Sequence, residues 1–167
     1  MVEKKKVDVV RIELVKEREV SFEDYDIEKL RVSKPEYAVK LVSTLFENSD
    51  REKVYVCALD TNKKPINISL VSMGGMNQCV IHIPEIFKAA ILANCPNIIV
   101  FHNHVSGNIK PSNEDKVITS RLEEAGEILQ IKLQDHIIVG KAGQFFSFKR
   151  EGLIYGKEKV AIVSSDL

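Results

Sequence analysis

Apolar positions along this chain fall into two kinds of pattern, short runs typical of strands and wider stripes typical of helices. Turn-rich segments containing Gly, Pro, Asn and Asp separate the strand-like runs, which lie at residues 7–14, 54–59, 66–73, 98–101, 131–139 and 145–148. Stripes with apolar residues three and four apart predict helices that begin near residues 33, 84 and 112. The predicted order is therefore β-α-β-β-α-β-α-β-β, which favours a single α/β layer fold.

The predicted helices have recognisable starts. Residues 33–36 have the form of a capping box with a proline in the first turn. Pro84 opens the second helix, and Ser112 is a candidate N-cap for the third, with Asp115 as an acidic residue in its first turn. The residues expected to face inward from the three helices are Ala38, Val39, Leu41, Val42, Leu45 and Phe46, then Ile86, Phe87, Ala89, Ala90, Ile91 and Leu92, then Ile118, Leu122, Ala125 and Leu129.

Composition is that of an ordinary globular protein. Of the 167 residues, 44% are hydrophobic and 29% are charged, which suits one domain with its own core. The 24 Lys and Arg residues balance the 24 Asp and Glu residues, so net charge gives no attraction to nucleic acid or anionic membranes. Cys57, Cys79 and Cys95 form no Cys-x-x-Cys pair and are expected to be buried, reduced thiols. Neither a signal peptide nor a membrane span is predicted, and the expected location is cytoplasmic.

The richest chemistry lies in one segment, where two histidines are followed at fixed spacing by a serine and an aspartate. His102 and His104 are separated by one residue, His104 and Ser112 by seven, and Ser112 and Asp115 by two. Residues two apart on a strand point to one face, and residues three apart at a helix start share a side. The two imidazoles and the carboxylate are therefore expected to converge. With a water in the fourth position they match an open zinc site, which lowers the pKa of its water to about 7.

A simpler interpretation is a solvated histidine pair on a loop. For Ser112 alone, helix capping explains the position fully. However, the four-residue pattern should arise by chance in only about 3 of 10,000 chains of this composition. The metal site is therefore the favoured interpretation.

A hydrolase would also need a general base in reach of the water. Glu52 directly precedes the apolar strand at residues 54–59, where a carboxylate is either an exposed strand-end charge or part of a site. Glu85 lies in the first turn of a predicted helix, where the helix dipole favours acids without any catalytic role. Glu52 is therefore the favoured base.

These residues resemble the signature of the JAMM (MPN+) metalloproteases, and the chain resembles the RadC-like branch of that family. The stretches that carry the resemblance are residues 51–60, 81–90, 101–104, 111–115 and 135–140, within a region from about Ser33 to Leu153. Val105 stands where the family usually has a proline, Asn108-Ile109 replaces its Asp-Pro, and the segment at residues 82–85 lacks its arginine. The departures at Val105 and Asn108-Ile109 concern the shape of the loop after the histidines.

The resemblance implies a three-layer α/β/α fold with a mixed central sheet, as in cytidine-deaminase-like JAB/MPN domains. It implies zinc held by His102, His104 and Asp115, with Ser112 stabilising the oxyanion of the tetrahedral intermediate. Glu52 would take a proton from water and later deliver it to the leaving amine. The chain is accordingly divided into an N-terminal strand and acidic loop packed on the domain (1–32), the JAMM/MPN domain (33–153) and a C-terminal tail or strand (154–167).

The favoured function is a zinc-dependent metallopeptidase or isopeptidase acting on an unidentified peptide or protein. The alternative is a non-catalytic RadC-like binding module associated with DNA repair or mobile elements. A zinc nuclease or deaminase is disfavoured, because the cysteine pair of zinc deaminases is absent and zero net charge does not attract phosphate. No membrane partner is expected, nucleic-acid binding stays open, and short strands could pair across a homodimer. His82 and His136 lie in strand-like runs and are expected to be hydrogen-bonded core or rim residues.

Overall fold

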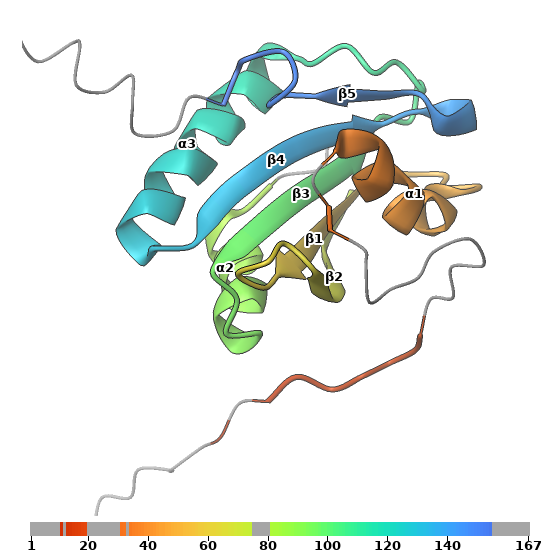
Figure 1. Ribbon diagram of the computed structural model, residues 1–167. Coiled ribbons are helices and arrows are strands. Elements are labelled where there is room, and N and C mark those ends of the chain that lie inside the picture. Colours follow the sequence, from red (N-terminus) through yellow and green to blue (C-terminus); the bar gives the residue numbers. More distant parts are fainter. Residues whose placement is uncertain (1–10, 12, 20–30, 33, 75–80, 155–167) are drawn as a thin grey trace, which may run out of the picture.

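A five-stranded mixed sheet forms the centre of the protein (Figure 1). The computed structural model describes residues 11, 13–19, 31–32, 34–74 and 81–154. The strands run in the order β2-β1-β3-β4-β5, with β3 and β4 parallel and the other neighbours antiparallel. The elements are α1 (Pro35–Phe46), β1 (Lys53–Leu59), β2 (Pro65–Met73), α2 (Ile83–Leu92), β3 (Asn97–Asn103), α3 (Asn113–Leu129), β4 (Lys132–Val139), the short 3-10 helix η2 (Lys141–Gly143) and β5 (Phe145–Ser147).

Helices cover both faces of this sheet, which confirms the predicted three-layer α/β architecture. Strand alternation divides β1 between two cores. Tyr55, Cys57 and Leu59 pack with the apolar face of α1, whereas Val54, Val56 and Ala58 pack with residues of α2 and α3. A strand buried on both faces has no room for polar positions, and β1 and β3 are accordingly continuous apolar runs over most of their length.

Most of the predicted inward-facing helix residues are buried, including all six on α1. Ile91 and Leu129 are exceptions, with 52% and 42% of their surfaces exposed. Each lies in the last turn of its helix, just before the chain turns away through a left-handed residue, Asn94 or Gln130. Their place on the apolar stripe therefore does not bury them.

The predicted start of α1 is wrong in its detail. The N-cap is Lys34 rather than Ser33, and the Lys34 side chain makes no capping bond, while Ser33 itself lies outside the described residues. His82 is likewise no strand residue, because it is the exposed N-cap of α2. Most of the strand predicted at residues 7–14, Cys79 and nearly all of residues 154–167 lie outside the described residues.

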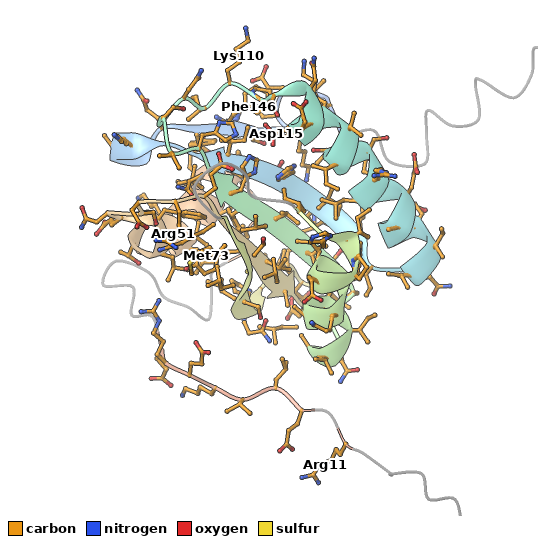
Figure 2. All side chains as sticks on the ribbon, turned by 180° about the vertical axis from the view of Figure 1, so that it is seen from behind. Arg11, Arg51, Met73, Lys110, Asp115 and Phe146 are labelled. Atoms are coloured by element: carbon orange, nitrogen blue, oxygen red, sulfur yellow. The ribbon has the colours of Figure 1, made fainter. Side chains whose placement is uncertain are left out.

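The connection from β3 to β4 positions the candidate site. Two parallel neighbouring strands need a crossover, and α3 supplies it. The helix runs back along the sheet, so its first turn lies over the end of β3. Figure 2 shows Asp115 at this start of α3, with Lys110 on the loop that leads to it. Among the described residues, no helix is long and apolar enough to cross a membrane.

Candidate metal centre

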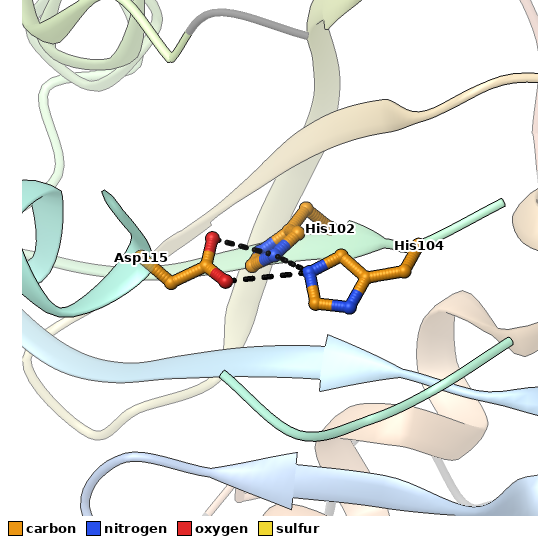
Figure 3. A group of neighbouring side chains, drawn as sticks. All are labelled: His102, His104 and Asp115. Atoms are coloured by element: carbon orange, nitrogen blue, oxygen red, sulfur yellow. Dashed lines mark hydrogen bonds and ion pairs between the residues drawn. The ribbon is translucent and has the colours of Figure 1, made fainter. Parts of the chain in front are cut away.

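Three side chains converge at the end of β3 (Figure 3). His102 Nε2 lies 3.1 Å from Asp115 Oδ1 and 3.1 Å from His104 Nε2. His104 Nε2 lies 3.3 Å from Asp115 Oδ2. In a tetrahedral zinc site with bonds of about 2.0 Å, neighbouring ligand atoms are about 3.3 Å apart. The two histidines contact different oxygens of Asp115, and one ligand atom of each residue lies within 4.8 Å of the others, so the group could hold a metal ion.

The two histidines reach this point from different kinds of backbone. His102 is the penultimate residue of β3 and is 4% exposed. By strand alternation it shares a face with Ile98 and Val100, the face covered by α2 and α3. His104 lies one residue beyond the strand, so strand geometry alone does not determine the direction of its ring.

The loop after β3 fixes the ring of His104. Gly107 adopts a left-handed conformation (φ +75°) and donates its N–H to the carbonyl of His104 at 2.9 Å. This tight turn returns the chain so that the carbonyl oxygen of Asn108 lies 2.6 Å from His104 Nδ1. A carbonyl can only accept a hydrogen bond, so Nδ1 carries the hydrogen and Nε2 keeps its lone pair for the centre. The contact uses the main chain of Asn108, while the side-chain Oδ1 of the same residue accepts the Lys110 N–H at 2.9 Å.

The N-terminus of α3 holds the carboxylate. Ser112 caps the helix by accepting the N–H of Asp115 at 3.0 Å, and both its own N–H and its hydroxyl donate to Asp115 Oδ2 at 2.7 Å. This reciprocal capping box agrees with the N-cap expected from the sequence. Burial raises the pKa of the Asp115 carboxyl, but contacts with His102, His104 and Ser112 outweigh it and hold that pKa well below its usual range. The carboxylate is therefore ionised.

The chemistry of the cluster also fits a cation. With its Nδ1 hydrogen committed to a carbonyl, a neutral His104 presents only a lone pair to an ionised carboxylate, which is itself an acceptor. Two acceptors at 3.3 Å need a positive charge between them. A proton can supply it, and the pKa of His104 is accordingly raised, first by the Asp115 bond and also by the charge of Glu52. A divalent metal ion can supply it equally well, because imidazole and carboxylate are common zinc ligands.

Glu52 lies near this centre because β1 and β3 are antiparallel. Val54 pairs with His102, so continuing the register by two residues brings Glu52 opposite His104. The side chain of Asn103 extends the pairing beyond the strand ends. Its Oδ1 accepts the Lys53 N–H at 2.8 Å, and its Nδ2 donates to the Arg51 carbonyl at 3.2 Å. The residues on both sides of Glu52 are thus attached to the end of β3.

Glu85 has a different environment. It forms an ion pair with Lys88 one turn later on α2, as expected for an acid in a helix's first turn. The two candidate bases therefore separate by position, and Glu52 is the one whose charge acts on a member of the cluster.

Two residues around the cluster were not assigned to the site from the sequence. His136, expected to be a hydrogen-bonded core or rim residue, is fully buried on β4, where burial lowers its pKa. Its Nε2 lies 2.9 Å from His102 Nδ1, and its Nδ1 lies 2.7 Å from the hydroxyl of Thr119 on α3. Only the pairing of β3 with β4 brings residues 34 positions apart into contact. The sequence carried no signal for it beyond the polarity of His136 in an apolar run.

Among the described residues, Cys57, Cys95 and Asp135 are buried but do not belong to the group that could hold a metal. Cys57 and Cys95 are buried free cysteines, as expected, and burial raises the pKa of each thiol. Buried Asp135 accepts hydrogen bonds from Ser147 and from two backbone N–H groups. These bonds tie Asp135 to the end of β5 and the residues after it, away from the histidine pair.

Comparisons with known proteins identify the domain. The family model described as the RadC-like JAB domain matches residues 32–153. A UPF0758 protein of Clostridium acetobutylicum is 41% identical over 127 residues, 76% of this chain and 55% of the relative. A UPF0758 protein of Thermotoga maritima is 46% identical over 103 residues, 62% of this chain and 46% of the relative. This chain thus spans about half the length of these curated relatives.

Proposed function

This chain belongs to the RadC-like JAB domain family, and we propose that it is a zinc-dependent hydrolase that cleaves an amide bond in a peptide or protein. The observation that carries the proposal is the convergence of two imidazoles and a carboxylate, with contacts of 3.1 and 3.3 Å between them, and with the Glu52 segment attached beside them. An open three-ligand site of this kind suits catalysis better than structure, since structural zinc sites are closed by four protein ligands.

The proposed ligands are His102 Nε2, His104 Nε2 and one oxygen of Asp115. A zinc ion held there supplies Lewis-acid chemistry, polarising a carbonyl and lowering the pKa of a water molecule. Glu52, opposite His104, accepts the proton of that water and later gives it to the nitrogen of the leaving amine. Proton acceptance and return by one carboxylate leaves the enzyme unchanged after each turnover.

Ser112 is the proposed donor to the oxyanion. Without substrate, its single hydroxyl hydrogen points to Asp115 Oδ2. Turning that hydroxyl toward a substrate oxygen would leave Asp115 Oδ2 still bonded to the Ser112 N–H. The carboxylate therefore keeps its orientation while the hydroxyl serves the reaction, and donors of this type are worth about 10²–10³-fold in kcat.

The test is to measure bound zinc and hydrolysis together. Purified protein loaded with zinc would be assayed for metal by elemental analysis and for cleavage of a fluorogenic peptide library. We expect close to one zinc per chain, and we expect Glu52→Gln to retain zinc but to lose hydrolysis. Glu85→Gln is the matched control, because it makes the same chemical change at an acid already paired with Lys88.

The outcomes separate the parts of the proposal. If Glu52→Gln is as active as the unchanged protein, then Glu52 is not the base. If hydrolysis is lost equally in Glu85→Gln, the base has been assigned to the wrong carboxylate or the loss is not catalytic. Absence of bound zinc, with absence of cleavage throughout the library, would reject the hydrolase in favour of the non-catalytic binding module.

A further inference from the structure

A relay of four hydrogen-bonding groups, on His102, His136, Thr119 and the main chain of Asp115, runs from the proposed metal centre into the core. It begins at His102 Nδ1, which lies 2.9 Å from Nε2 of His136. On the other side of the same ring, His136 Nδ1 lies 2.7 Å from Thr119 Oγ1. The hydroxyl of Thr119 lies 2.6 Å from the main-chain oxygen of Asp115, one helical turn earlier. All of these groups are buried, so water cannot substitute for a missing partner.

The position of every hydrogen in this relay follows from its last member, the main-chain oxygen of Asp115. The carbonyl oxygen of Asp115 has no hydrogen, so the short contact with Thr119 requires that the hydroxyl donate to it. The only hydrogen of that hydroxyl is then used, and Thr119 must accept from His136. The Nδ1 of His136 therefore carries a hydrogen.

The same reasoning passes through His136 to His102. A neutral imidazole has one N–H, so His136 presents a lone pair at Nε2. His102 must then donate from Nδ1 to make the 2.9 Å contact, which leaves the lone pair of His102 at Nε2. This is the nitrogen that faces His104 and Asp115 at 3.1 Å.

We propose that Thr119 and His136 are positioning residues that set the tautomer of His102, so that its Nε2 lone pair is presented to a metal ion. The inference rests on the metal part of the proposed function and extends it beyond the ligands. Because the relay ends on the main chain of Asp115, the two ligands His102 and Asp115 are tied to one another through the core. Metal-ligating histidines generally need such a partner on the second ring nitrogen, and its loss lowers metal affinity about 10- to 100-fold.

The hydroxyl of Thr119 is the member of the relay that can be removed with least disturbance to the packing of the core. Thr119→Val keeps the shape of the side chain but leaves His136 Nδ1 without an acceptor. His136 is then free to place its hydrogen on Nε2 and donate to His102, whose own hydrogen would move to Nε2 and block the metal. Thr119→Ser keeps the hydroxyl and is the matched control.

Two measurements test the relay. The first is the tautomer of His102 in the metal-free protein, read from long-range ¹H–¹⁵N correlation spectra at about pH 8, above the ordinary imidazole pKa of about 6.5. We expect the hydrogen on Nδ1 in the unchanged protein and in Thr119→Ser, and a shift toward Nε2 in Thr119→Val. The second is the affinity for zinc ion alone, measured by competition with a chelator, which we expect to fall about 10- to 100-fold in Thr119→Val and to be retained in Thr119→Ser.

The result that overturns the inference is a hydrogen on Nε2 of His102 in the unchanged, metal-free protein. This spectrum needs no variant, so it decides the question even if Thr119→Val does not fold. A folded Thr119→Val that keeps both the tautomer and the zinc affinity overturns it equally. Failure of the proposed function is seen separately, as absence of peptide cleavage, because neither measurement uses a substrate.

Discussion

Replacing Asn103 with alanine tests whether Glu52 is held in place by the end of β3. The change removes two hydrogen bonds, to the Lys53 N–H at 2.8 Å and to the Arg51 carbonyl at 3.2 Å. At about 1 kcal/mol net for each bond, the free energy of unfolding should fall by about 2 kcal/mol. A domain with a stability of about 5–15 kcal/mol stays folded after such a loss.

The effect on hydrolysis should be larger than the effect on stability suggests. Asn103 contacts none of the proposed ligands in these bonds, so zinc affinity should be unchanged. Without its side chain the segment around Glu52 is released, and a displacement of about 1 Å at a catalytic group can cost about 10²-fold in rate. We therefore expect kcat/KM to fall about 100-fold with zinc still bound.

The other end of the same strand supplies a matched control. Asn97 also makes two hydrogen bonds through its side chain, donating to the Asp60 carbonyl at 3.0 Å and accepting from Gln134 at 2.6 Å. It is the first residue of β3, six residues from Asn103, or about 20 Å along the strand. Asn97→Ala should lose a similar amount of stability but keep full hydrolysis.

The assay compares the two variants by urea unfolding, bound zinc and peptide cleavage at saturating zinc. The reasoning is refuted if Asn97→Ala loses as much activity as Asn103→Ala, because the loss would then follow stability alone. It is refuted as well if Asn103→Ala cleaves as fast as the unchanged protein.

Three further predictions concern the centre and its supporting helix. The pKa of His104 in the metal-free protein is raised above 6.5. Its proton therefore stabilises the metal-free fold below pH 6.5, and that stability is lost as pH rises through the raised pKa. Zinc binding must displace this proton. The difference in unfolding temperature between zinc-loaded and metal-free protein should therefore widen as pH rises through that pKa, and a difference in calorimetry that does not change with pH would contradict this. Ser112→Ala removes the cap of α3 and one bond to Asp115 Oδ2, so urea unfolding should show a loss of about 1 kcal/mol and chelator competition a weaker zinc site; unchanged values would argue against both roles. A Cβ at Gly126 would lie 2.5 Å from the carbonyl oxygen of Ile131, so Gly126→Ala should cost about 1–3 kcal/mol in urea unfolding, and an unchanged midpoint would show that the backbone there yields easily.

The sequence was most informative where one local rule determines the structure. Strand alternation and a helix start at Ser112 were enough to predict that His102 and Asp115 face one another, and the structure places them 3.1 Å apart. The apolar stripe of α1 was predicted in full for the same reason. The prediction of burial was wrong where the apolar stripe of a helix reached its last turn. The exposed side chains of Ile91 and Leu129 lie on an apolar stripe but in a last turn, where the direction of the following chain decides burial.

Other parts of the centre depend on contacts that no local pattern contains. The ring of His104 is directed by a loop carbonyl, which has no signature in residue type because every residue has one. The bond between His102 and His136 needs the parallel pairing of β3 with β4, and the attachment of Glu52 needs the antiparallel pairing of β1 with β3. Knowledge of the strand order, rather than of further motifs, would have been required to predict them.

The positions of the hydrogens on the two imidazole rings explain why the centre fits a cation. His104 donates outward to the Asn108 carbonyl, and His102 donates outward to His136. The Asp115 carboxylate accepts two hydrogen bonds from Ser112 at Oδ2. The hydrogens of both rings therefore point away from the point where the three groups meet, and the ring lone pairs point toward it. Because such an arrangement repels itself unless a proton or a metal ion lies inside, the fold favours the occupied state. Mutations of His136, Thr119 and Ser112, which hold these groups in place, should therefore weaken metal binding even though none of the three is a proposed ligand.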